Sequence, residues 1–155
     1  VLVGAHLDAT RVDLQRVLLY VVKLLDALVD TDFTLVYAHS MVESRHEPPF
    51  AWLRQLYTIF DYKFAARLRG LYVVHPTWFL KVFYTCLAPF MSSQFNAKVR
   101  YCAGVRDLLN ATERGKHLYT RDQLNLPRHV YAEDTARHGR RWDDAIAKAG
   151  GGGGG

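Results

Sequence analysis

Apolar residues along this chain fall into two patterns, short continuous runs and longer stretches with helical spacing. The short runs predict strands at residues 1–7, 33–39 and 71–74, and a partly alternating run predicts a less buried fourth strand at residues 97–103. The stretches in which apolar residues recur every three or four positions predict helices at residues 10–29, 48–68, 77–91 and 105–111. Because strand and helix alternate, the pattern predicts an α/β fold, a three-layer α/β/α sandwich with a largely parallel sheet.

Turn and capping residues mark several of the predicted boundaries. Thr10 with Asp13 three residues later resembles a capping box at the start of the first helix. Gly70 is placed to cap the end of the second helix. Pro76 disfavours a helical conformation at His75, which is expected to stay extended before the third helix begins.

Length and composition favour one globular domain followed by a tail. The chain has 155 residues, of which 50% are hydrophobic, so residues 1–134 can form a sizeable core. Val130–Tyr131 is expected to be a last extended piece, and residues 135–155, basic and then glycine-rich, are expected to be a flexible tail. No apolar run reaches the roughly 18 residues of a membrane span. The chain opens inside an apolar run without a methionine, which indicates a piece of a longer protein.

Charge and cysteine content narrow the partners and the compartment. The formal charge of +5 is spread over several segments and forms no dense basic stripe, so no nucleic acid is expected as a partner. The same charge is compatible with weak attraction to an anionic membrane surface. Cys86 and Cys102 lie in apolar settings without CxxC spacing; two buried reduced thiols are favoured over a disulfide, and they fit the cytoplasm.

No recognisable catalytic set occurs in the sequence. Nucleophile-elbow and phosphate-binding glycine motifs are missing, so the chain is not predicted to be an enzyme. His39, Ser40 and His46 are either solvated loop residues or part of a metal site, and the spacing favours the former. Asp8 and His39 follow predicted strands, where α/β folds place ligands, so they are candidates to line a pocket.

The third predicted helix is apolar over most of its circumference. Only one narrow strip carries polar or small residues, namely Thr77, Lys81, Tyr84, Thr85 and Ala88. A surface helix needs only one apolar stripe, so this helix must bury its wide apolar surface in something. Two interpretations stay open at this point: an ordinary core helix, or a helix that covers a lipid or a groove for a protein.

A small basic group ends the second predicted helix. Lys63, Arg67 and Arg69 lie close together in the sequence. They are either solvated residues favoured by the helix dipole or a weak patch for an anionic headgroup.

Several segments, taken in order, resemble the divergent branch of the CRAL-TRIO lipid-binding domains, which includes the BCH domains of Rho-GTPase-activating proteins. The resemblance spans about residues 1–134. The most specific segment is Leu71–Phe79, with the motif Tyr-Val-Val-His-Pro-Thr, followed by Lys81. The weaker segments are Phe33–His39, Trp52–Lys63, Leu124–Pro127 and Glu133–Asp134.

This resemblance implies a non-enzymatic domain that binds or senses a lipid in an apolar cavity closed by a gate helix. By position, the gate residues would be Trp78, Phe79, Val82, Phe83, Cys86, Leu87 and Phe90. The cavity floor would include Leu35, Tyr37 and Val73. The phosphoinositide headgroup motif of the transfer proteins is not recognisable here.

The resemblance also sets the expected partners. The ligand would be a lipid or another small apolar molecule, and no other cofactor is expected. The expected location is the cytoplasm, and the alternative is peripheral contact with a membrane surface. The alternative function is a protein-interaction scaffold that binds a small GTPase or self-associates, since divergent members of the family also serve in this way.

Overall fold

The structure of the protein is a computed structural model that describes residues 1–114 and 125–138. Its strands are β1 (Leu2–Val3), β2 (Phe33–Ala38), β3 (Leu68–Val74) and β4 (Val99–Cys102). Its α-helices are α1 (Leu14–Asp26), α2 (Phe50–Lys63), α3 (Trp78–Leu87), α4 (Ser93–Asn96), α5 (Val105–Arg114) and α7 (Arg128–His138). Short 3₁₀ turns are η1 (Gly4–His6), η2 (Ser44–His46) and η3 (Ala88–Phe90).

The four strands form one parallel sheet in the order β1-β2-β3-β4. Tyr37 pairs with Leu2 of β1 on one side and with Val73 of β3 on the other. An irregularity after Phe33 shifts the register, so that β2 and β3 match residue for residue from Thr34 onward. The predicted α/β class and parallel sheet are therefore confirmed.

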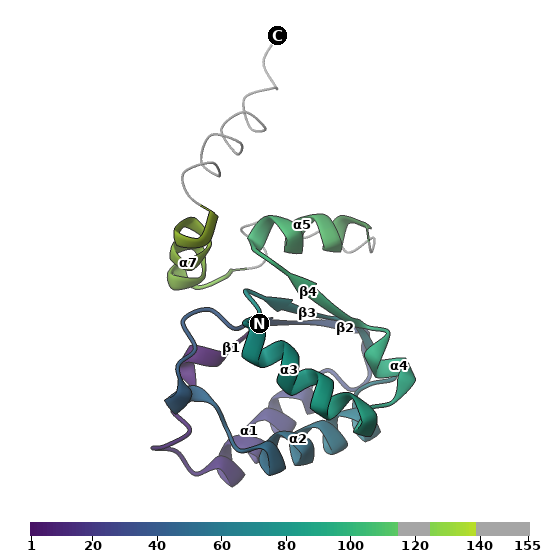
Figure 1. The fold of residues 1–155 in the computed structure, drawn as a ribbon. Helices are drawn as coiled ribbons and strands as arrows, with labels where there is room; N and C mark the ends of the chain where they lie inside the picture. Colours follow the sequence, from purple (N-terminus) through teal and green to yellow (C-terminus); the bar gives the residue numbers. More distant parts are fainter. Residues whose placement is uncertain (115–124, 139–155) are drawn as a thin grey trace.

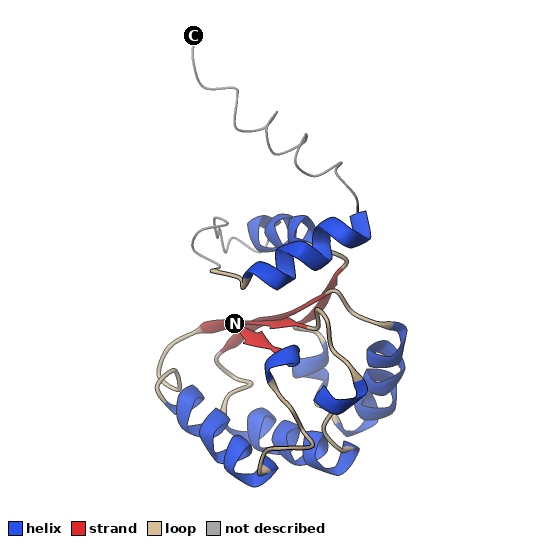
Figure 2. Ribbon diagram, turned by 90° about the vertical axis from the view of Figure 1, so that its left-hand side faces the viewer, coloured by secondary structure: helices blue, strands red, loops and turns tan. Residues whose placement is uncertain are grey.

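The helices lie in two layers on opposite faces of the sheet. Helices α1, α2, α3 and α4 cover one face, whereas α5 and α7 cover the other, as Figures 1 and 2 show. This division follows from the strand order. Each strand from β2 to β4 adds to the same side of the strand before it. Right-handed crossovers therefore place every connecting helix on the same face. Only the helices that follow β4 are free to cover the second face.

Two apolar clusters fill the spaces between the layers. The cluster between the sheet and the α5/α7 layer, called the upper core, consists of Val36, Ala38, Tyr72, Val74, Cys102, Val105, Leu108, Leu126 and Val130. The cluster on the α1–α4 side, called the lower core, consists of Leu25, Phe33, Tyr57, Phe60, Phe64, Ala65, Leu68, Leu87 and Phe95. Strand residues divide between the two cores by simple alternation, as expected for a sheet covered on both faces.

The predicted start of the first helix is wrong by several residues. The cap of α1 is Asp13, whose Oδ1 accepts hydrogen bonds from the backbone N–H groups of Gln15 at 2.9 Å and Arg16 at 3.3 Å. Thr10 donates its hydroxyl to Asp8 at 2.6 Å instead. Either residue type can cap a helix, so the sequence alone did not decide between them.

The predicted cap at Gly70 is also wrong. Helix α2 ends at Lys63, and Phe64 takes the C-cap position. Strand β3 starts at Leu68, so Gly70 lies inside the strand and pairs with Thr34. The periodic apolar pattern continued to Leu68 because Phe64 and Leu68 both reach the lower core, although they do so from a turn and a strand.

The end of the described chain is helical where an extended piece was predicted. Val130 and Tyr131 belong to α7, and Val130 is buried in the upper core. Helix α7 continues through Thr135 to His138, residues that the composition had assigned to the tail. Residues 139–155, the rest of the predicted tail, lie outside the described residues.

Among the described residues, no helix is long and apolar enough to cross a membrane.

Candidate functional site

Helix α3 begins at a corner formed by two residues of the His-Pro-Thr motif. Pro76 precedes Thr77, whose side-chain oxygen accepts the backbone N–H of Leu80 at 3.2 Å and so caps the helix. The α-helix runs to Leu87, and Pro89 lies in the 3₁₀ turn that follows. The helix predicted for residues 77–91 therefore ends earlier than its apolar pattern, since proline cannot continue a helix.

Little of α3 is buried, although most of its residues are apolar. Leu87 is its only buried residue, and Leu80, Phe83 and Tyr84 are half-buried. Trp78 is 78% exposed. The apolar residues exposed on α3, on its 3₁₀ extension and at the neighbouring start of α2 are called the α3 face, namely Phe50, Trp78, Phe79, Val82, Cys86 and Phe90.

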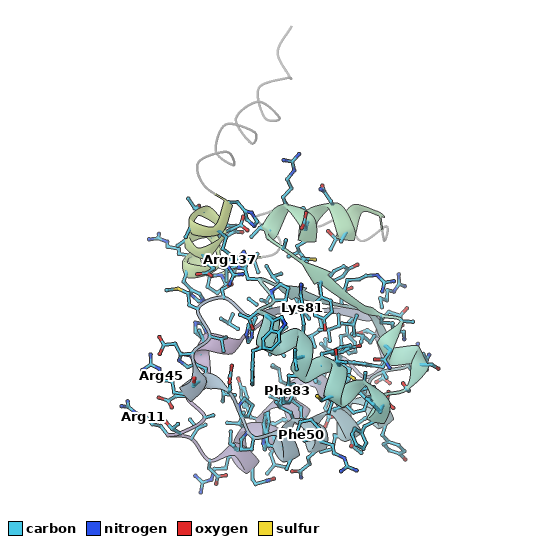
Figure 3. All side chains as sticks on the ribbon, viewed as in Figure 1. Arg11, Arg45, Phe50, Lys81, Phe83 and Arg137 are labelled. Carbon is cyan, nitrogen blue, oxygen red and sulfur yellow. The ribbon has the colours of Figure 1, made fainter. Side chains whose placement is uncertain are left out.

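Contacts at the helix surface hold α3 to the body. On one side the Phe83 ring packs edge-on against Phe50 of α2 with centroids 5.3 Å apart, and the two side chains are labelled in Figure 3. On the other side the Tyr84 hydroxyl donates to Asn96 at 2.6 Å, and its ring lies 5.8 Å from that of Tyr101. These contacts are aromatic and polar, so α3 rests on the lower core and is not embedded in it.

Cations lie on aromatic rings at both sides of α3. The Arg54 guanidinium lies 4.6 Å from the centroid of the Phe90 ring. The Lys81 ammonium lies 6.0 Å from the centroid of the Tyr101 ring. Neither cation has an ion-pair partner among residues 1–114 and 125–138.

The three strand residues predicted as a cavity floor lie on the sheet face that α3 covers. Leu35 packs against the lower core, and Tyr37 shares its face by strand alternation. Val73 lies on the same face of β3 as Leu71, which also packs against the lower core. Burial raises the pKa of the Tyr37 hydroxyl to about 12, and the charge of Glu47 adds to the shift.

The predicted headgroup residues are all ion-paired within the chain. Lys63 pairs with Asp26. Arg67 and Arg69 both reach Asp32, at 3.7 Å and 2.8 Å, and the hydrogen bond from Arg69 lowers the pKa of that carboxyl more than any other contact does. Because each positive charge has a carboxylate partner, these three residues present little free charge to an anion.

The two cysteines differ in burial. Cys86 is exposed on the α3 face, so the prediction that it is buried is wrong. Cys102 is buried in the upper core, where burial raises its thiol pKa to about 12 and the Asp107 charge contributes. Both are free thiols, so the preference for reduced cysteines over a disulfide is confirmed.

A cluster of three buried polar side chains, Ser40, His75 and Asp134, lies where strands β2 and β3 end. Ser40 Oγ lies 2.7 Å from His75 Nδ1, and His75 Nε2 donates to Asp134 Oδ1 at 2.8 Å. The same Asp134 oxygen accepts the backbone N–H of Val105 at 3.0 Å. The three side chains follow β2, follow β3 and lie on α7, so the cluster ties two strand ends and the α5/α7 layer together.

The backbone at His75 is left-handed, so the prediction of an extended residue is wrong. Its φ is +55°, and its N–H donates to the carbonyl of Cys102 at 3.1 Å. Pro76 disfavours only the right-handed helical region. The cost of an unusual φ is offset because this conformation turns both ring nitrogens toward buried partners.

The cluster has the residue types of a Ser-His-Asp triad but not its accessibility. Ser40 and His75 are 0% exposed, and Asp134 is 6% exposed. A nucleophile must reach a substrate atom, and a sealed hydroxyl cannot do so. Gly104, in the bend between β4 and α5, closes the cluster, since a Cβ there would collide with Asp134. The arrangement therefore has a structural role, and we call the hydrogen-bonded side chains of Ser40, His75 and Asp134 the lock.

His39 and His46, like Ser40, are buried, so the prediction of solvated loop residues is wrong for all three. His46 accepts the backbone N–H of Glu43 at 2.8 Å through Nδ1. Among the described residues, no group of three histidine, cysteine or carboxylate side chains could hold a metal ion. The sequence named Ser40 only as a loop or metal-site candidate and Asp134 only within the Glu133–Asp134 segment of the resemblance. It gave no signal that the two side chains meet at His75, because Asp134 lies far away along the chain.

A second hydrogen-bonded chain connects β2 to the cap of α3. The Thr77 hydroxyl, which accepts the N–H of Leu80, also lies 3.2 Å from His39 Nε2. The other ring nitrogen, Nδ1, lies 3.1 Å from the Tyr37 hydroxyl. The neutral form of His39 therefore suits the start of α3.

Acidification is expected to destabilise the fold through His39. Burial lowers its pKa to about 4, with a smaller contribution from the positive charge of Arg137, whereas an unfolded histidine titrates near 6.5. Between these values the unfolded chain binds a proton that the folded chain does not, so stability falls as the pH falls. From pH 7 to pH 4 this residue alone is expected to cost about 3 kcal/mol.

The measurement is urea unfolding at several pH values for the wild type and His39→Asn. The difference in unfolding free energy between the two proteins should shift in favour of the variant between pH 6.5 and pH 4. All other titrating groups are shared, so they cancel in this difference. Parallel pH profiles would contradict the assignment.

Comparison with known proteins matches this fold. The family described as "Divergent CRAL/TRIO domain" matches residues 1–136. A "Protein GDAP2 homolog" from Drosophila melanogaster is 32% identical over 146 residues, which are 94% of this chain and 26% of that protein. "Rho GTPase-activating protein gacY" from Dictyostelium discoideum is 35% identical over 127 residues, 82% of this chain and 17% of that protein.

A third relative is a human protein. "Rho GTPase-activating protein 1" is 35% identical over 124 residues, which are 80% of this chain and 27% of that protein. The chain therefore spans about a quarter or less of the length of these three relatives.

Proposed function

This chain belongs to the divergent CRAL/TRIO domain family, and from that premise we propose that it binds a lipid or another small apolar molecule beneath helix α3. In this proposal α3 is a gate helix. The α3 face meets the apolar ligand or the membrane surface, and Leu35, Tyr37 and Val73 form the floor on which the ligand rests.

The observation that carries the proposal is the mismatch between the composition of α3 and its burial. Trp78, Phe79 and Phe90 are large apolar side chains, and each is more than half exposed. Fully burying a side chain of this kind is worth about 1.5–3 kcal/mol, so leaving three of them in water forgoes several kcal/mol. An exposed apolar group of this size marks a surface that has a partner.

The few contacts between α3 and the rest of the domain support a helix that can move. Its contacts with the body include the buried side chain of Leu87, the Phe83–Phe50 ring pair, the hydrogen bond of Tyr84 and the capped corner at Thr77. A helix with one buried side chain can lift from the lower core at a small cost compared with α2, which buries Trp52, Tyr57 and Phe60. The corner at Thr77 would then act as the hinge.

The proposed role is non-enzymatic. Members of the family are generally lipid-binding domains without catalysis, and the Ser40–His75–Asp134 cluster is closed to substrate. Arg54 of α2 and Lys81 of α3 itself have no ion-pair partner in the described parts of the chain, and they support peripheral contact with an anionic surface.

Native mass spectrometry and vesicle sedimentation test the proposal together. The purified chain should retain an apolar small molecule that organic solvent extracts, and it should sediment with vesicles of phosphatidylcholine and phosphatidylserine. A chain that carries no lipid after expression, takes none from vesicles and sediments with none of them would overturn the proposal.

The second candidate function is a scaffold that binds a small GTPase. It is favoured by the relatives named as Rho GTPase-activating proteins, which match 80% or more of this chain. Titration with a Rho-type GTPase loaded with GDP or with a non-hydrolysable GTP analogue distinguishes it from lipid binding. A saturable, nucleotide-dependent signal without any vesicle binding would favour the scaffold.

A further inference from the structure

The titratable residue His39 lies at the corner from which helix α3 starts. Its Nδ1 lies 3.1 Å from the hydroxyl of Tyr37, a residue of the proposed cavity floor. Its Nε2 lies 3.2 Å from the hydroxyl of Thr77, which caps α3. The backbone N–H of His39 donates to the carbonyl of Val74 at 3.0 Å and so anchors the residue at the end of the sheet. One imidazole therefore joins the floor of the proposed lipid site to the hinge of its gate.

The surroundings of His39 favour a neutral ring. The residue is 3% exposed, and burial lowers its pKa, with a smaller contribution from the positive charge of Arg137 on α7. Glu47, which precedes α2, acts on Tyr37 and raises the pKa of that hydroxyl after burial does. No carboxylate forms an ion pair with His39 in the described parts of the chain. A proton on this ring would meet a second cation and no compensating anion.

The start of α3 is also an unfavourable place for a cation. The first turn of a helix carries a partial positive charge, and that of α3 contains no acidic residue. A neutral imidazole has one donor and one acceptor nitrogen, so one of the hydroxyls of Tyr37 and Thr77 donates to it. Protonation converts this acceptor into a donor and breaks that hydrogen bond. A charged His39 therefore destabilises the closed corner.

Helix α3 is the element that can expose His39 to water at the lowest cost. Helix α7, which brings Arg137 to the ring, is tied to the strand ends by the buried hydrogen bonds of Asp134. Helix α3 buries only Leu87. Local opening occurs first in the elements with the fewest buried contacts. Lifting α3 at Thr77 removes the contact on Nε2 and lets water reach the ring.

We infer that His39 is a pH-sensitive switch of the α3 gate, whose protonation releases the corner at Thr77 and favours the state in which α3 lifts to meet a membrane. The inference rests on the proposed function, because it concerns the regulation of the same gate. The neutral ring holds the gate closed near pH 7. An acidic medium opens it.

The direction and size of the effect follow from proton linkage. In the closed state the pKa of His39 is about 4, whereas in the lifted state the ring is in water and titrates near 6.5. Between these values the lifted state binds a proton that the closed state does not, so a fall in pH favours lifting. From pH 7 to pH 5 the equilibrium constant for lifting is expected to rise about twentyfold. While the closed state predominates, the apparent affinity for vesicles rises by the same factor.

Sedimentation of the 155-residue chain with vesicles of phosphatidylcholine and phosphatidylserine at pH 7, 6 and 5 tests the switch. The partition coefficient of the wild type should rise about twentyfold over this range, and His39→Asn should lose this rise. His6→Asn is the matched control, because His6 is exposed in η1, and it should keep the wild-type rise. The other histidines are common to all three proteins, so their gain of charge cancels in the comparison.

Hydrogen exchange without vesicles reports the motion of α3 itself. From pH 7 to pH 5 the protection of the α3 amides should fall relative to that of the α2 amides, whereas α7 should keep its protection. Comparing helices within one sample removes the effect of pH on the intrinsic exchange rate. In His39→Asn the ratio of α3 protection to α2 protection should not change with pH.

Three results would overturn the inference. They are wild-type vesicle binding that does not change with pH, a rise in binding that His39→Asn retains, and a loss of protection in acid that is equal in α2, α3 and α7 or that begins in α7. The first result leaves lipid binding itself intact. A chain that binds vesicles at no pH contradicts the proposed function, whereas a loss of α3 protection in acid that depends on His39 would still support the switch, so the two failures are distinguishable.

Discussion

Asp134→Ala is expected to lower the free energy of unfolding by about 3–5 kcal/mol, because it leaves two buried N–H donors without an acceptor, each at a cost of about 1–3 kcal/mol. Asp134 Oδ1 accepts hydrogen bonds from the His75 ring and from the backbone N–H of Val105, and all three groups are buried. After the substitution both donors would face an apolar interior without an acceptor. The loss would also free α7 from the strand ends.

Denaturant unfolding of the wild type and the variant measures this effect. Glu133→Ala is the matched control, because Glu133 is the neighbouring acid on α7 and forms only a surface pair with Arg137. Its loss should cost less than about 1 kcal/mol. Asp134→Asn keeps an oxygen in place and should fall between the two. Equal losses for Asp134→Ala and Glu133→Ala would refute the assigned role of the cluster.

Phe79→Asp combined with Val82→Asp is expected to reduce partitioning into vesicles by a hundredfold or more. Each side chain contributes about 1.5–3 kcal/mol when it moves from water into an apolar phase, and a carboxylate in its place opposes insertion. Both residues are exposed on α3, so the substitutions should leave the fold intact. The measurement is sedimentation with vesicles over a series of lipid concentrations.

The control for this pair is Tyr62→Asp, which introduces the same charge at an exposed aromatic residue on α2. It should bind vesicles like the wild type if the α3 face is the contact surface. Retained binding by the α3 double variant, or equal loss in the control, would show that the membrane meets the protein elsewhere.

The apolar pattern determined the layered fold because burial is periodic in each element. Short runs such as Leu71–Val74 became strands buried on both faces, and the three-to-four spacing at Tyr57, Phe60 and Phe64 placed these rings in one core. The exact caps could not be predicted. Asp13 and Thr10 are equally suited to cap a helix, and only the chain path before α1 selected between them.

The wide apolar surface of α3 was also readable in the sequence, as was the His-Pro-Thr corner at its start. The sequence could not say which part of that surface the body covers. Leu87 and Cys86 are adjacent, yet one is buried in the lower core and the other is exposed. That difference depends on where α3 lies over the sheet. The same is true of α1, whose pattern predicted an ordinary amphipathic helix but whose outer side remains uncovered.

What the sequence by itself determined is therefore the alternation of the four strands with α1, α2, α3 and α5, the parallel sheet, the family and the apolar character of α3. These depend on local spacing and on burial, which act within a few residues. The tertiary structure alone decided the lock of Ser40, His75 and Asp134, since His75 and Asp134 are 59 residues apart. Hydrogen bonds over such a separation exist only after the layers have packed, and they hold His75 in a conformation that no local rule selects.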